Sequence, residues 1–284
     1  DGQIADKTIA DLKRMAKQGK PFFMACGFMK PHLPFYAPKK YWDLYDRTSL
    51  ILADNQTRPQ NAPEVLTGSK EILNYHDRGM EYNQEQWHRA CLHGYYACVS
   101  YIDAQVGRLI TTLDNLGLRK NTIVIVWGDH GWHLGEHTFW GKHNLMHLSS
   151  RSPLILSIPG GRKNQTCDRL VEFVDIYPTL LDLAGITPQN KGLEGTSFKI
   201  LLQRPRTLWK KAAFSRYGPA ISAITPKFNY VQYKSGEKML FDLISDPDEN
   251  INIAGDPKRK STLNHHIKIL GNGWIDALPP SVQK

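Results

Sequence analysis

Two short apolar runs constrain the fold of this chain more than any other feature of its sequence. They cover residues 122–127 and 152–158, and each has the length of a buried strand, far below the roughly 20 apolar residues of a membrane-spanning helix. Apolar residues at helical spacing flank these runs at 4–18, 87–116 and 171–184. This alternation predicts an α/β fold with a mostly parallel central sheet sandwiched by helices and joined by right-handed crossovers.

The rest of the chain divides into a long loop and a C-terminal part. Residues 22–28 predict a further buried strand, whereas residues 29–86 are rich in Pro, Asn, Asp and aromatic residues without a sustained period. A loop of that length commonly forms the wall of a binding site. After Pro205 the pattern changes to short strands with a turn at Ser235-Gly236, which predicts a small antiparallel sheet. These strands are expected at 212–217, 228–233 and 238–243.

The net charge of the chain favours an acidic partner. Lys and Arg number 36 against 27 Asp and Glu, giving a formal charge of +9. Such an excess suits a sulfated glycan, a phosphate-rich surface or nucleic acid, and it also fits charges spread over a solvated surface. No basic run is interleaved with aromatic residues, so we expect no nucleic-acid partner. No membrane span is expected either.

The four cysteines predict free thiols rather than a disulfide framework. Cys26, Cys91, Cys98 and Cys167 form no C-x-x-C pair. Cys91 and Cys98 lie two turns apart on the predicted helix at 87–116, which is too far for a disulfide. We therefore expect buried free thiols, with the redox compartment left open.

The residues after the strand at 122–127 predict a cation site. Asp129 and His130 leave the carboxyl end of that strand, where ligands of α/β sheets bind, and glycines on both sides allow a sharp turn. A carboxylate and an imidazole held together there suit a divalent cation. A structural Asp cap beside a hydrogen-bonded His is the alternative.

The same segment contains an apparent zinc-protease pattern. His133-Leu-Gly-Glu-His137 matches H-x-x-E-H, in which both imidazoles must lie on one face of a regular helix. Gly131 and Gly135 disfavour such a helix, and no third ligand follows. We therefore interpret the match as a coincidence in a His-rich loop.

Two residues from other strand ends predict an anion site beside the cation site. His32 lies in a proline-rich loop after residues 22–28, and Lys142 lies thirteen residues beyond Asp129. A cation, a lysine and a histidine in one crevice would bind a sulfate or a phosphate. Each residue alone also has a plainer interpretation, His32 as a loop hydrogen-bonding group and Lys142 as a solvated side chain.

Together these segments resemble the type I, formylglycine-dependent sulfatases of the alkaline-phosphatase superfamily, and among them the iduronate-2-sulfatase-like group. The similarity runs along nearly the whole chain. It is carried by Pro21-Phe-Phe through Lys30-Pro-His32, Tyr95 to Arg108, Gly128 to His137, Trp140-Gly-Lys142, Val171 to Thr179 and Leu240 to Asn250.

The resemblance implies roles for particular residues. Asp129 and His130 would be ligands of one Ca²⁺ ion, and His in the second place is typical of the iduronate-2-sulfatase-like branch. His32 and Lys142 would hold the sulfate and help the leaving oxygen depart. Trp132, His133 and His137 would line the mouth of the site near the sugar.

The resemblance also implies an activity, a location and a missing part. It implies a secreted, periplasmic or lysosomal sulfatase acting on a sulfated sugar or polysaccharide such as a glycosaminoglycan. The family's nucleophile is a formylglycine made in a C-x-P-x-R or S-x-P-x-R context, which none of these 284 residues provides. We therefore expect the C-terminal portion of a sulfatase, with the other calcium ligands and the formylglycine in an N-terminal portion that acts as its partner.

On this basis residues 1–205 are expected to be part of the catalytic α/β domain and residues 206–284 a small α+β subdomain. The segment alone is expected to be inactive. Two alternatives stay open: a phosphoesterase of the same superfamily, which generally uses two zinc ions, and a catalytically inactive relative that binds sulfated glycan.

Overall fold

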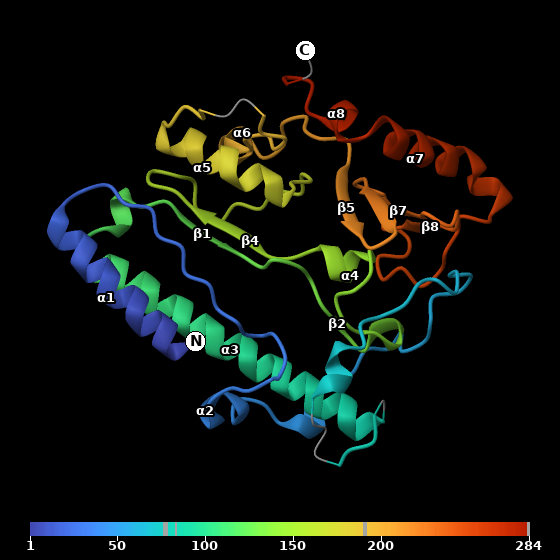
Figure 1. The fold of residues 1–284 in the computed structure, drawn as a ribbon, viewed down its shortest axis with the longest axis horizontal. Coiled ribbons are helices and arrows are strands. Elements are labelled where there is room, and N and C mark those ends of the chain that lie inside the picture. The colour runs from blue at the N-terminus through green and yellow to red at the C-terminus, as the bar shows by residue number, and fades with distance from the viewer. Residues whose placement is uncertain (76–78, 83, 190–191, 283–284) are drawn as a thin grey trace.

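The computed structural model describes residues 1–75, 79–82, 84–189 and 192–282 (Figure 1). Parts of the predicted loop, at 76–78 and 83, therefore lie outside the described residues. The helices are α1 Gly2–Gln18, α2 Lys39–Trp42, α3 Glu85–Asn115, α4 His147–Ser150, α5 Ile176–Ala184, α6 Lys199–Gln203, α7 Lys260–Asn272 and α8 Trp274–Ala277. The strands are β1 Val124–Trp127, β2 His133–Leu134, β3 Trp140–Gly141, β4 Leu154–Ser157, β5 Ala213–Tyr217, β6 Ala220–Ile224, β7 Phe228–Tyr233 and β8 Lys238–Asp242.

The N-terminal part is a layer of helices built on α3. Figure 1 shows α1 alongside α3, and the backbone N–H of Gly2 donates to the Tyr101 hydroxyl at 2.6 Å. Gly19 ends α1 in the left-handed conformation (φ 61°), as a C-terminal cap should. Both helices begin within two residues of the position predicted from apolar spacing. Val99, an apolar residue of α3, is exposed.

Strands β1 and β4 form the two-stranded sheet next to the site, and they pair antiparallel. The prediction of parallel pairing is wrong for these two strands, because apolar composition reports burial but not strand direction. Helices α5 and α6 cover one face, where Leu201 and Trp209 pack with Leu154 and Leu156. Ile155 is 62% exposed, so the described residues do not cover both faces as predicted.

Residues 22–28 do not form the predicted buried strand. The segment has no strand assignment, and its residues alternate between partly buried and exposed. Phe23 is 84% exposed. Burial alternates from one residue to the next, as it does in a strand. However, none of the described segments provides a hydrogen-bonding partner for this backbone.

The C-terminal part contains the predicted antiparallel sheet, in the order β5-β6-β7-β8. The turn between β7 and β8 lies at the predicted Ser235-Gly236, where Gly236 has a φ of 108°. Strand β6 and helix α7 were not predicted from the sequence. The sheet packs through Val231 and Met239 against Leu145 and Met146, close in sequence to Lys142. The boundary at residues 205 and 206 stays a prediction.

Candidate active site

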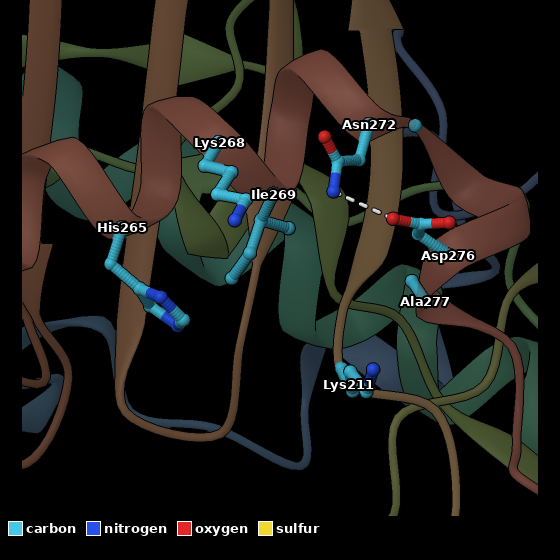
Figure 2. A pocket seen from close by; sticks show the side chains of 8 residues that line it. Lys211, His265, Lys268, Ile269, Asn272, Asp276 and Ala277 are labelled. Atoms are coloured by element: carbon cyan, nitrogen blue, oxygen red, sulfur yellow. Dashed lines mark hydrogen bonds between the residues drawn. The ribbon is translucent and has the colours of Figure 1, made fainter.

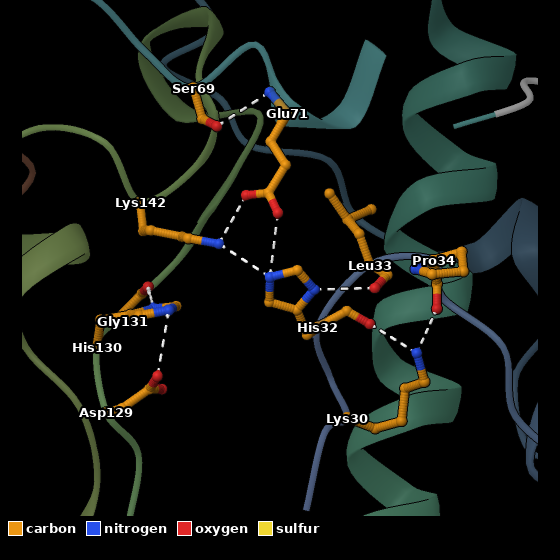
Figure 3. Close-up of polar contacts among 10 residues, drawn as sticks. All are labelled: Lys30, His32, Leu33, Pro34, Ser69, Glu71, Asp129, His130, Gly131 and Lys142. Carbon is orange, nitrogen blue, oxygen red and sulfur yellow. Dashed lines mark hydrogen bonds and ion pairs between the residues drawn. The ribbon is translucent and has the colours of Figure 1, made fainter. Parts of the chain in front are cut away.

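The two residues predicted to bind an anion meet in the structure. Lys142 Nζ lies 3.0 Å from His32 Nε2 (Figure 3). The Lys142 side chain is only 14% exposed, so its ammonium group is largely shielded from water. An amine and an imidazole facing each other in a partly buried position suit an anionic ligand.

One apolar cluster holds both residues in place. Leu33, next to His32, packs with Trp87, Leu92 and Trp140, and Trp140 precedes Lys142 by two residues. Between them lies Gly141 with a φ of 122°, and a Cβ at this position would lie 2.6 Å from the Ser69 Cβ. Only glycine allows strand β3 to approach the 69–71 segment this closely.

Backbone contacts orient the His32 ring. Its Nδ1 lies 2.9 Å from the carbonyl oxygen of Leu33. Since a carbonyl only accepts, Nδ1 carries a proton and Nε2 is the nitrogen that faces the site. Lys30 Nζ donates to the carbonyl oxygens of His32 at 2.9 Å and Pro34 at 2.6 Å, which ties down the loop.

A third residue, Glu71, completes this cluster and was not identified from the sequence. Its Oε2 accepts from Lys142 Nζ at 2.7 Å, and its Oε1 lies 3.1 Å from His32 Nε2. Burial acts to raise the pKa of Glu71, but the hydrogen bond and charge of Lys142, with the His32 ring, hold that pKa below its usual value. The length of the 29–86 loop was the only signal in the sequence that this segment reaches the site.

Asp129 and His130 leave strand β1 at its carboxyl end, as predicted. His130 Nδ1 lies 2.8 Å from the Gly131 carbonyl oxygen, which leaves Nε2 3.6 Å from Asp129 Oδ2. The Asp129 side chain is 86% exposed, so its oxygens are free to bind a cation. Within the described ranges no group of three His, Cys, Asp or Glu side chains could hold a metal.

This pair fits part of a calcium shell. A carboxylate is the oxygen donor that Ca²⁺ prefers, and Ca²⁺ takes six to eight ligands. Asp129 offers such an oxygen and the His130 ring offers a nitrogen, so a Ca²⁺ ion at this position would need most of its ligands from other groups.

Trp132 connects the cation pair to the anion-binding pair. Its ring stacks on His130 with centroids 6.1 Å apart and meets the His32 ring edge-on at 6.1 Å. Lys142 Nζ lies 5.0 Å from the indole centroid, within the range of a cation–π contact. His32, His130 and Lys142 thus surround one indole, which is partly buried.

The predicted role of His133 and His137 at the mouth is wrong, because both side chains are fully buried. His133 Nε2 lies 3.3 Å from Asn144 Oδ1, and His137 Nε2 lies 2.7 Å from the Asp248 carbonyl oxygen. Burial lowers the pKa of His133 to about 4, so the ring is neutral. His137 has a φ of 57°, so the H-x-x-E-H segment is not the regular helix of a zinc protease.

The four cysteines are free, as predicted. Burial raises the pKa of Cys91 to about 12 and that of Cys98 to about 11, so both thiols stay protonated and unreactive. The expectation of burial is wrong for Cys167, which is exposed.

A separate pocket of about 270 Å³ lies in the C-terminal part (Figure 2). Lys211, His265 and Lys268 line it, together with an Asp276 that accepts a hydrogen bond from Asn272 at 2.6 Å. The pocket shares no residue with the His32–Lys142 site.

Comparison with known proteins identifies the family. The sulfatase family model matches residues 1–186, and the model for the C-terminal part of N-sulphoglucosamine sulphohydrolase matches residues 135–271. The chain therefore belongs to the sulfatase family, and the resemblance is confirmed.

Individual relatives agree with this assignment. A sulfatase of Formosa agariphila is 35% identical over 89% of this chain and 50% of its own length. The iduronate 2-sulfatase of Mus musculus is 33% identical over 66% of this chain and 40% of its own length. The chain thus spans about half the length, or less, of these curated relatives.

Solved structures confirm the predicted fold class, α/β of the alkaline-phosphatase type with a C-terminal antiparallel sheet. A structure in complex with its substrate D-glucosamine-2-N,6-O-disulfate covers 95% of this chain and 68% of its own, with a TM-score of 0.84 at 21% identity. A phosphonate monoester hydrolase of Silicibacter pomeroyi covers 98% of this chain and 60% of its own, with a TM-score of 0.81 at 22% identity. At these identities the likeness shows the fold alone, which serves both sulfur and phosphorus chemistry.

Proposed function

We propose that the protein containing this chain hydrolyses sulfate esters of a sulfated sugar or polysaccharide, with a uronic acid 2-sulfate as the first substrate to test. The observation that carries the proposal is the His32–Lys142 pair, 3.0 Å apart and next to Trp132. Family membership and the sulfatase names of the curated relatives favour sulfur over phosphorus as the reacting centre.

The two residues have complementary tasks in ester cleavage. Lys142 can donate to the sulfuryl oxygens and offset their negative charge. His32, when protonated at Nε2, can donate that proton to the sugar oxygen as the sulfur–oxygen bond breaks. The aromatic face of Trp132 offers a contact for the substrate at the same position.

The proposed reaction also needs a cation and a nucleophile. Asp129 and His130 would hold part of the shell of one Ca²⁺ ion, which when bound offsets charge on the sulfuryl oxygens. A formylglycine would supply the nucleophile, and its motif does not occur in these 284 residues.

We also propose that an N-terminal portion of the same protein packs on this chain. Trp127 in β1 and Ile155 in β4 are large, apolar and exposed, and so is Phe23 in the unpaired segment 22–28. Exposed apolar side chains at a sheet are typical of a surface covered by further strands. Location outside the cytoplasm, whether secreted, periplasmic or lysosomal, is proposed from the family resemblance. Over the described residues no helix is long and apolar enough to cross a membrane.

The test uses the protein expressed from the complete reading frame that encodes this chain. Sulfate release is measured from a 2-O-sulfated uronate disaccharide, an N,6-disulfated glucosamine and an aryl sulfate, with the matching phosphate esters beside them. Lys142→Met is compared with Lys7→Met, which removes an exposed lysine of helix α1.

We expect sulfate release that depends on Ca²⁺, falls about 100-fold or more in Lys142→Met and is unchanged in Lys7→Met. Faster cleavage of the phosphate esters would favour the phosphoesterase alternative. Tight glycan binding without turnover would favour the inactive relative.

A further inference from the structure

The proposed mechanism does not explain why the Glu71 carboxylate lies in the site. Its two oxygens bind two different partners: Oε2 accepts from Lys142 Nζ at 2.7 Å and Oε1 lies 3.1 Å from His32 Nε2. Figure 3 shows Glu71, His32 and Lys142 pointing toward one another from three separate segments. One acidic group thus contacts both residues expected to act on the sulfate.

The groups around Nε2 influence whether the His32 ring carries a second proton. Because Nδ1 already carries a proton toward the Leu33 carbonyl, the ring can act as an acid only if Nε2 is protonated as well. An ammonium group 3.0 Å from Nε2 opposes a second positive charge and favours the lone-pair form of the ring. A carboxylate at 3.1 Å favours the protonated form.

We propose that Glu71 is a positioning residue, whose carboxylate keeps His32 protonated at Nε2 beside Lys142 so that the ring can protonate the leaving sugar oxygen. This inference rests on the proposed sulfate-ester hydrolysis. Besides Glu71, the charged group that faces His32 is Lys142. Besides His32, the charged and titratable groups that face Glu71 are Lys142 and His143. Lys30 contacts only backbone oxygens of the His32 loop.

The local structure holds Glu71 in this place. It is the first residue of a one-turn 3-10 helix, Glu71–Asn74, and its backbone N–H donates to Ser69 Oγ at 3.1 Å. The next residue, Ile72, is buried in the same apolar cluster as Leu33 and Trp140. One cluster therefore fixes the three backbone segments from which Glu71, His32 and Lys142 project.

The proposed step breaks one sulfur–oxygen bond and transfers one proton. The sulfur–oxygen bond to the sugar breaks, and its electron pair stays on the sugar oxygen. The proton on His32 Nε2 moves to that oxygen, giving the alcohol, while the sulfuryl group passes to an oxygen nucleophile and finally to water. The neutral His32 can then accept a hydrogen bond from Lys142 at Nε2, which stabilises the ring until it is reprotonated.

The test compares leaving groups in the complete protein. Glu71→Gln keeps the shape of the side chain but removes its charge. The substrates are the sulfated sugar that the parent protein hydrolyses best, whose alkoxide needs a proton, and 4-nitrophenyl sulfate, whose leaving group needs none. Glu85→Gln is the matched control, because Glu85 pairs with Arg89 on the exposed face of α3.

We expect Glu71→Gln to lower kcat on the sugar sulfate by about 100-fold with little change in KM. The loss on 4-nitrophenyl sulfate should be less than about tenfold, since protonation contributes little there. Glu71→Asp should recover part of the activity, and Glu85→Gln should match the parent. An equal loss on both substrates would mean a merely structural role and would overturn the inference, as would no loss on either.

A second measurement does not depend on turnover. In the complete protein, NMR signals of the His32 ring are followed against pH in the parent and in Glu71→Gln. The ring should lose its proton at a lower pH in the variant, and an unchanged titration would contradict the role of Glu71. An inactive parent protein with a shifted ring titration would count against sulfate-ester hydrolysis, whereas an active parent with an unshifted titration would count against Glu71 alone.

Discussion

Lys210 extends its ammonium group to 2.8 Å from Oδ2 of Asp175, and both side chains are buried almost completely. Glu172 Oε2 accepts from the same ammonium group at 2.6 Å. Asp175 also accepts from the backbone N–H groups of Glu172 and Thr196. This ion cluster connects the start of α5 to the segment that enters strand β5.

Lys210→Met should destabilise the protein strongly. The change leaves two carboxylates without their buried cation, which costs about 3–5 kcal/mol of unfolding free energy. Lys199→Met is the control, because Lys199 pairs with Asp182 near the surface and should cost less than about 1 kcal/mol. Urea denaturation measures both, and similar losses would contradict the importance of burial.

The buried Glu249 should make stability depend on pH. Burial raises its pKa from 4.5 to about 7, against the hydrogen bonds from Asn229 and His147. The folded state therefore binds a proton that the unfolded state releases between these values. The stabilising contribution of Glu249 is full below about pH 4.5, is lost as the pH rises through 7, and changes by roughly 3 kcal/mol.

Glu249→Gln isolates this contribution, because the histidines titrate alike in both proteins. The unfolding free energy of the parent minus that of the variant should be larger at pH 5 than at pH 8. An equal difference at the two pH values would show that Glu249 does not titrate in this range.

Gly131→Ala should disturb the segment that carries His130 and Trp132. A Cβ at this position would lie 1.9 Å from the Leu148 carbonyl oxygen and 2.4 Å from that of Arg151. Both are backbone atoms, so the segment has to move, at a cost of about 1–3 kcal/mol. Near-UV circular dichroism should report the altered Trp132 environment.

Gly107→Ala provides the opposite case. Gly107 lies in α3 with no atom within 4 Å of an added Cβ, so alanine should raise stability by about 0.5–1 kcal/mol. A stabilising effect of Gly131→Ala would rule out the close approach described here.

Residues 1–284 on their own should not hydrolyse aryl or sugar sulfates. They contain neither C-x-P-x-R nor S-x-P-x-R, the contexts in which the family forms its nucleophile. Turnover by a preparation whose intact mass is 32.3 kDa would contradict this prediction. The parent protein from the complete reading frame serves as the positive control.

Local patterns predicted helices α1, α3 and α5 but not α7. Apolar spacing and terminal glycines placed α1, α3 and α5, because a helix forms its backbone hydrogen bonds within one segment. Strand pairing was predicted less well, since direction and partner depend on distant segments. Residues 22–28 have the composition of a strand and lack a pairing partner among the described residues.

Residue type and position after expected strand ends selected His32, Lys142, Asp129 and His130 as candidates, although residues 22–28, which precede His32, do not form a strand. The family resemblance implied that His133 and His137 line the mouth of the site, and this failed because both side chains are buried in the interior. Their hydrogen-bond partners, Asn144 and the Asp248 carbonyl, satisfy the buried rings, and a local pattern does not reveal such contacts.

The sequence by itself determined the family, the fold class and the kinds of side chain available for binding an anion. Only the tertiary structure decided which of them meet. It joined Glu71 to His32 and Lys142 across separations of 39 and 71 residues by burying Leu33, Ile72 and Trp140 in one cluster. The reason is physical: apolar burial is non-directional and acts between any segments that can pack together, so the contacts it creates have no signature in local spacing.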